Sequence, residues 1–182
     1  YGDTAYAGCI VHTPTYNTNK ISTAESPKTW EDLLDPKWRG QLGMVSDMKT
    51  WEQLAVEDGG WGVEKTTQYL TKLAQQKIIW GSGRPAAHSL MAAGEFKINV
   101  EGNLDYTIKG KENGEPVEWV RCNPVVVAGA TQMLQKKAPH PNAARLFYEW
   151  LLSPQGAIVY ENVAKYGIVY PGAKTEQAKL VE

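Results

Sequence analysis

Short apolar segments alternate with helix-like segments along nearly the whole chain of 182 residues. Segments 41–45, 78–80 and 97–100 are short and apolar, whereas segment 63–75 repeats apolar residues at helical spacing. Strands that alternate with helices build a layered fold, because each helix covers one face of the sheet. The sequence therefore predicts an α/β fold.

Capping residues predict where several helices begin and end. Thr29, with Asp32 three residues later, is a cap pattern for a short helix. Pro85 suits the first turn of a helix, and Gly94 suits the end of the same helix. Ser153 is expected to cap the last helix.

Three polar turns follow predicted strands directly. They are residues 46–51, 81–85 and 101–104, and each leads into a predicted helix. In open α/β sheets ligands bind at the carboxyl ends of the strands, where helix N-termini present free N–H groups. We expect the three turns to converge on one small ligand, although ordinary caps explain any single turn. The candidate ligand-facing residues are Asp47, Thr50, Trp51, Ser82, Gly83, Arg84, Asn103 and Tyr106.

Arg84 indicates the chemical class of the ligand. Its planar guanidinium suits a carboxylate or a phosphonate, and Thr50 and Ser82 would add hydroxyl groups. An organic anion is therefore the first choice, and a cationic amine held by Asp47 is the second. The alternative is that Arg84 binds a nearby carboxylate such as Glu101 and only ties two loops together.

Composition excludes some classes of protein and favours a polar cleft. The formal net charge is −1, so the chain lacks the excess of Lys and Arg that is typical of a nucleic-acid binder. The chain has 7 Trp and 9 Tyr but 2 Phe, and Trp and Tyr combine a large apolar ring with a polar group. We expect Trp51 to form a wall of the cleft; the alternative is that such residues fill the core.

Motifs of catalysis and metal binding are absent from the sequence. It contains no nucleophile elbow, no phosphate-binding loop and no dinucleotide fingerprint. His12, His88 and His140 do not lie at metal-ligand spacing from one another. Cys9 and Cys122 form no CxxC pair, and either two free thiols or one disulfide is compatible with the sequence. The sequence predicts no enzyme, no cofactor and no metal site.

Five segments resemble a known family, in the same order as in that family. Residues 26–40 read SPKTWEDLLDPKWRG, residues 16–18 read YNT and residues 92–95 read AAGE. Residues 137–147 read KAPHPNAARLF, and residues 151–156 read LLSPQG. The chain resembles bacterial extracellular solute-binding proteins of ABC importers, and is similar to the iron(III)-type branch of type II periplasmic binding proteins.

The resemblance implies one lobe of a two-lobed receptor, with a mixed, mostly parallel sheet flanked by helices. Residues 1–18 would form a lobe-crossing hinge strand and residues 19–123 the second ligand-binding lobe. Residues 124–182 would form the returning hinge strand and C-terminal helices, and the first lobe would be mostly missing.

In function, the resemblance implies capture of a small polar or anionic solute in the cleft between two lobes. The solute would pass to ABC permease subunits in the membrane, without nucleic acid as a partner. The protein would be periplasmic or extracellular, with a signal peptide that is not in this sequence.

Two alternatives stay open for the function. Iron-binding members place adjacent tyrosines at the third turn, where this chain has Tyr106 alone, so a ferric-iron receptor is less favoured. The effector-binding domain of a transcription regulator shares the two-lobed architecture.

Two structural expectations follow from the resemblance. Cys9 and Cys122 lie on or beside predicted crossing strands and are expected to be close in space. In the predicted helix 142–152, Ala144, Phe147, Leu151 and Leu152 are expected to face the core.

Overall fold

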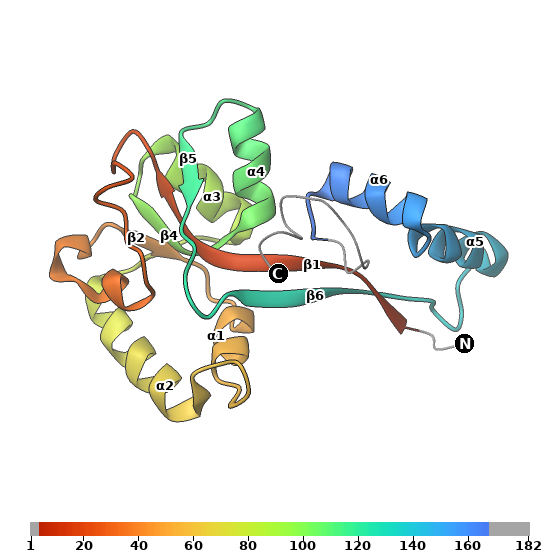
Figure 1. Cartoon of the computed structure of the whole chain (residues 1–182), viewed down its shortest axis with the longest axis horizontal. Coiled ribbons are helices and arrows are strands. Elements are labelled where there is room, and N and C mark those ends of the chain that lie inside the picture. The colour runs from red at the N-terminus through yellow and green to blue at the C-terminus, as the bar shows by residue number, and fades with distance from the viewer. Residues whose placement is uncertain (1–3, 168–182) are drawn as a thin grey trace. The chain divides into compact units, whose positions relative to one another are not determined.

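The computed structural model describes residues 4–167, which contain six strands and six α-helices (Figure 1). The strands are β1 (Thr4–Asn17), β2 (Leu42–Met44), β3 (Ile79–Trp80), β4 (Ile98–Asn103), β5 (Val117–Trp119) and β6 (Val126–Met133). The helices are α1 (Lys49–Leu54), α2 (Gly62–Leu73), α3 (Arg84–Ala93), α4 (Leu104–Glu112), α5 (Pro141–Leu151) and α6 (Pro154–Ala164). Three short 3₁₀ helices cover Glu31–Leu34, Pro36–Trp38 and Ala74–Gln76.

The chain divides into two compact units. One unit, which we call the sheet unit, is His12–Val126. The other, which we call the terminal unit, combines Tyr1–Val11 with Val127–Glu182, of which residues 4–11 and 127–167 are described.

The strands form a mixed sheet in the order β3-β2-β4-β1-β5, with β6 paired to β1. Strand β2 runs parallel to β3 and to β4, whereas β1 runs antiparallel to β4 and to β5. Helices flank this sheet, so the predicted α/β fold is confirmed (Figure 1). Strand β1 falls within the segment 1–18 that was expected to form a strand, and it continues along β4 and β5 as far as Asn17.

Apolar strand residues and aromatic rings make the core of the sheet unit. Leu42 of β2 and Ile98 of β4 are completely buried, together with Trp30 from the loop after β1. On β2, a Cβ atom added to Gly43 would overlap the ring of Phe96, so glycine lets this ring pack directly on the strand.

Three of the predicted helix ends are confirmed by their contacts. Asp32 Oδ2 accepts from the Thr29 amide at 3.0 Å, and Thr29 Oγ1 accepts from the Asp32 amide at 3.2 Å. Gly94 ends α3 with a φ of +87°, a conformation that glycine adopts without strain. Ser153 Oγ accepts from the Gly156 amide at 3.1 Å and so caps α6.

The expectation for the core face of α5 is only partly correct. Leu151 is buried, but Phe147 is 59% exposed and stacks on Trp150, with 5.7 Å between ring centroids. Among the described residues, no helix is long and apolar enough to cross a membrane.

Candidate functional site

The carboxyl ends of the three parallel strands lie at one edge of the sheet unit. Gly43 of β2 pairs with Ile79 of β3 and with Asn99 of β4, which fixes the register of all three strands. Strand β1 enters the same edge from the opposite direction, because its His12 pairs with Asn103 at the end of β4. We call this edge the carboxyl edge.

Arg84, the first residue of α3, connects the segments at the carboxyl edge. Its Nε donates to Asp47 Oδ2 at 3.2 Å, and Asp47 lies in the turn after β2. Its Nη1 donates to Glu101 O at 2.9 Å and to Asn103 Oδ1 at 3.0 Å, both on β4. The same Nη1 lies 2.8 Å from His12 Nδ1, and Nη2 lies 3.5 Å from Glu101 Oε2. We call these five residues the Arg84 cluster.

The Arg84 cluster is mostly shielded from water. The side chain of Arg84 is 14% exposed and that of Glu101 is 0% exposed, while the side chain of Asp47 is 30% exposed. Charge pairs in such surroundings are screened less than surface pairs are. Asp47 is therefore the charged side chain of the cluster most open to a ligand.

Burial shifts the pKa of two members in opposite directions. Desolvation, helped by the charge of Arg84, lowers the pKa of His12 to about 4. Because a guanidinium can only donate, the neutral His12 ring accepts at Nδ1 and carries its proton on Nε2. Desolvation raises the pKa of Glu101 to about 7, although the nearby Arg84 acts in the opposite direction.

Asp47 behaves differently from Glu101. Its partial burial pushes the pKa upward, but hydrogen bonds from the Lys49 amide and Arg84 outweigh this and lower the pKa of Asp47. Asp47 is therefore ionised at neutral pH and pairs with Arg84 as a true counter-ion.

The structure brings some of the predicted residues together and leaves others apart. Arg84 contacts both Asp47 and Asn103, and Ser82 and Gly83 precede Arg84 in the same turn. Ser82 is exposed. Tyr106 is half-buried on α4, and its ring centroid lies 5.9 Å from that of His88.

Trp51 does not form a wall of a cleft, contrary to the expectation from the sequence. Trp51 is 1% exposed and packs in the core, with its ring centroid 6.1 Å from that of Trp30 and 6.0 Å from that of Tyr69. Its neighbour Thr50 is also fully buried, and its side-chain hydroxyl lies beside the buried carboxyl of Glu101. An aromatic residue in a polar turn can line a cleft or pack in the core, and here Trp51 packs among the aromatic rings of the core.

His12 and Glu101 belong to the cluster but were not among the candidate ligand-facing residues. Glu101 was expected only as a partner that ties Arg84, and the structure shows this contact. His12 reaches the carboxyl edge through the antiparallel pairing of β1 with β4, which no local sequence signal reveals.

Two free thiols are one of the two alternatives that the sequence leaves open for its cysteines. Cys9 and Cys122 are both free and buried, and burial raises the pKa of Cys122 to about 12. They lie in different units, so their expected closeness stays a prediction. Between residues 4 and 167, no group of three or more His, Cys, Asp and Glu side chains could hold a metal ion.

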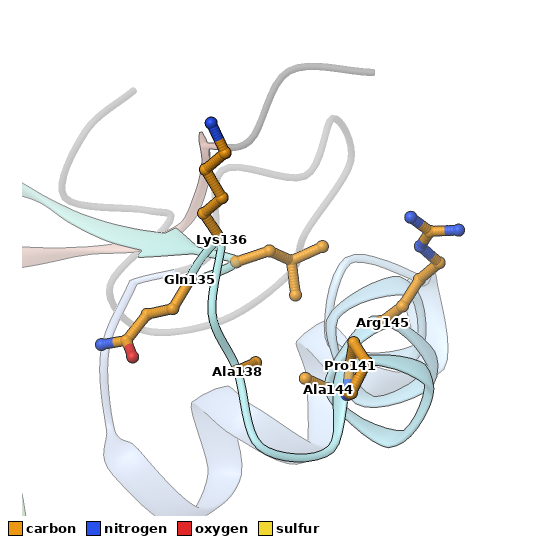
Figure 2. A pocket seen from close by; sticks show the side chains of 7 residues that line it. Gln135, Lys136, Ala138, Pro141, Ala144 and Arg145 are labelled. Atoms are coloured by element: carbon orange, nitrogen blue, oxygen red, sulfur yellow. The ribbon is translucent and has the colours of Figure 1, made fainter.

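A cavity of about 320 Å³ lies in the terminal unit, and none of the predicted ligand-facing residues lines it. Figure 2 shows Lys136 and Arg145 extending away from a floor formed by Ala138, Pro141 and Ala144. The other lining residues are Leu134 and Gln135. No lining side chain is a buried polar group that would fix a ligand, so the Arg84 cluster remains the better candidate.

Comparison with known proteins identifies the family of the chain. A family model described as bacterial extracellular solute-binding protein matches residues 4–180, and the chain belongs to this family. A curated relative, an uncharacterized protein of Haemophilus influenzae, is 28% identical over 141 residues. This match covers 75% of the present chain and 40% of the relative.

Solved structures of periplasmic binding proteins share the fold. The periplasmic binding protein P5PA has a TM-score of 0.79 at 23% identity, covering 96% of this chain and 57% of its own. Iron-bound HitA from Pseudomonas aeruginosa has a TM-score of 0.77 at 25% identity, covering 97% of this chain and 60% of its own. AfuA from Actinobacillus pleuropneumoniae, with fructose-6-phosphate bound, has a TM-score of 0.74 at 21% identity, covering 95% of this chain and 57% of its own.

These matches confirm the family-level resemblance and the prediction that the chain is not an enzyme. The chain spans less than two thirds of the length of each of these relatives.

Proposed function

We propose that the chain is the solute-binding part of an ABC importer's receptor and binds a small polar solute at the carboxyl edge of the sheet unit. An organic anion is the favoured solute. The site of action is the periplasm or the cell exterior, which fits a family of extracellular proteins.

One observation carries this proposal. Arg84 lies where three parallel strands end, and it contacts groups from the turn after β2, from β4 and from β1. In open α/β sheets, this is the position at which ligands bind. The Arg84 side chain there keeps 14% of its surface exposed, and a guanidinium can attract the charged group of an anion.

The other candidate residues would hold the remaining parts of the solute. In the turn before α3 Ser82 is exposed and Gly83 is half-buried, and Tyr106 is half-buried on helix α4. Thr50 and Trp51 are buried, so either would need a local rearrangement to reach a solute.

The architecture of the receptor is part of the proposal. Residues 19–123 would act as the second ligand-binding lobe, and a first lobe would close over the solute. Residues 1–18 and 124–182 would supply the hinge strands and C-terminal helices. The closed receptor would then release its solute to ABC permease subunits.

Arg84→Ala tests the role of Arg84. The solute is first identified by native mass spectrometry of the protein purified without denaturation, and its affinity is then measured by calorimetry. Losing a charged hydrogen bond should cost about 1.5–3 kcal/mol of binding free energy, roughly a 10- to 150-fold loss of affinity.

The matched control is Arg145→Ala, which removes an exposed arginine from the terminal unit. It should leave the affinity unchanged. Normal solute binding by Arg84→Ala would remove Arg84 from the site, even if the variant melts at a lower temperature because Glu101 has lost its counter-ion.

Ferric iron is a second candidate, because iron-bound HitA is similar to this chain. Tyr106 would be the phenolate ligand from this unit. Addition of ferric citrate should then produce a visible phenolate-to-iron absorption band that Tyr106→Phe removes. The effector domain of a transcription regulator is the weaker alternative, because the matched family is extracellular.

A further inference from the structure

The three nitrogens of the Arg84 guanidinium are not equally used. Nε donates to the ionised Asp47, and Nη1 faces three acceptors on β1 and β4. Among the described residues, Nη2 has one hydrogen-bond partner, Glu101 Oε2, at a distance of 3.5 Å. This distance is at the long limit for a hydrogen bond. Nη2 is therefore the nitrogen with the most donor capacity left for a solute.

The partner of Arg84 Nη2, Glu101, is fully buried. Its side chain is 0% exposed, and hydrogen bonding from the Thr50 hydroxyl and the Val45 amide, like the charge of Arg84, does not offset the cost of burying the carboxylate. A fully buried carboxylate is costly when charged, and a proton on the carboxyl removes that cost. Burial accordingly raises the pKa of Glu101 to about 7.

We propose that Glu101 makes anion binding at Arg84 proton-dependent: the solute binds when Glu101 is protonated, and its binding takes up a proton. This inference rests on the proposed function and names a positioning residue for it. With Glu101 ionised, two carboxylates face one guanidinium and repel an anion. With Glu101 protonated, Arg84 and Asp47 balance each other and Nη2 is free to bind the solute.

The other titratable groups around Glu101 differ from it. Asp47, in the turn after β2, has a lowered pKa and stays ionised. His12, on β1, has a pKa of about 4 and stays neutral near pH 7. Asp105, at the start of α4, has a pKa raised by burial and is the group whose titration must be separated from that of Glu101. Lys49 lies near Asp47 and His12.

Sulfate is the probe, because it is a dianion that does not titrate near neutral pH. The chain is titrated with sulfate at constant ionic strength, and binding is followed through the NMR signal of the Arg84 Nε–H group. If only the form with protonated Glu101 binds, linkage predicts an affinity about tenfold lower at about pH 8 than at about pH 6. In Glu101→Gln, the affinity should be equal at both pH values and as high as that of the wild type at the lower one.

Two control variants assign the pH dependence. Asp47→Asn changes the affinity but should keep the tenfold dependence, because Asp47 is ionised throughout. Asp105→Asn should also keep it. A dependence that survives Glu101→Gln, or that disappears in Asp105→Asn, overturns the inference.

The inference and the proposed function fail in different ways. If the sulfate affinity measured through the Arg84 signal is the same at both pH values, the anion site is supported and the proposed role of Glu101 is wrong. If sulfate does not shift that signal even at about pH 6, the anion site and the inference both fall. A ¹³C titration of the Glu101 carboxyl that gives an ordinary acidic pKa overturns the inference without any ligand.

Discussion

His12 and Glu101 contact the same guanidinium but respond to burial in opposite ways. Burial favours the uncharged form of each side chain. It therefore lowers the pKa of His12 and raises the pKa of Glu101. For His12, the unfolded chain takes up its proton first, so stability falls as the pH drops from 6.5 towards about 4. For Glu101, the folded chain takes up its proton first, so stability rises as the pH drops from about 7 towards 4.5.

We therefore predict that two variants have opposite pH slopes of stability where these windows overlap. As the pH falls through that range, Glu101→Gln should lose about 1.4 kcal/mol of unfolding free energy per pH unit relative to the wild type. His12→Asn, whose Oδ1 can replace Nδ1 as the acceptor, should gain about as much. Urea unfolding at several pH values measures both slopes. Parallel curves for the wild type and both variants would contradict the assigned protonation states.

Part of the candidate site could be predicted from residue types alone. Asp47, Arg84 and Asn103 are polar residues at or directly after the ends of apolar strands, and the structure brings them into contact. Trp51 could not be placed, because the same local sequence suits a cleft wall or a core position. His12 joins the cluster only through the register of β1 on β4.

At the scale of elements, the sequence located helix ends better than helix faces. A cap such as Ser153 uses contacts within one turn, so the local sequence determines it. The face that a helix buries depends on its neighbours. In α5, Leu151 is buried as expected but Phe147 is not. The short helix expected after Thr29 is a 3₁₀ helix, Glu31–Leu34, and Thr29 and Asp32 exchange hydrogen bonds at its start.

The cap of α6 gives a prediction at this scale. Ser153→Ala removes the oxygen that accepts from the Gly156 amide, and should lower the free energy of unfolding by about 1 kcal/mol. Ser153→Asn keeps an acceptor and serves as the control. Urea denaturation followed by far-UV circular dichroism measures both variants. Equal midpoints for Ser153→Ala and the wild type would show that the cap contributes nothing.

At the scale of the whole molecule, the fold class could be predicted because strands and helices alternate and five segments match one family. The expected division into residues 19–123 and the flanking segments 1–18 and 124–182 stays a prediction. The compact units divide within β1, whose residues up to Val11 lie in the terminal unit and those from His12 onward in the sheet unit. The Arg84 cluster lies entirely within the sheet unit. The central claim is thus that the carboxyl edge of this unit binds the solute.

Chemical-shift mapping of the whole chain tests that claim most directly. Backbone amide signals are recorded while a mixture of organic acids, sugar phosphates and amines is added. We expect weak binding, because a single edge leaves much of a solute in water. The shifted signals should cluster at residues 46–51, 81–85 and 101–106 and at His12. Shifts confined to the cavity beside Lys136 and Arg145, with the carboxyl edge unchanged, would contradict the account.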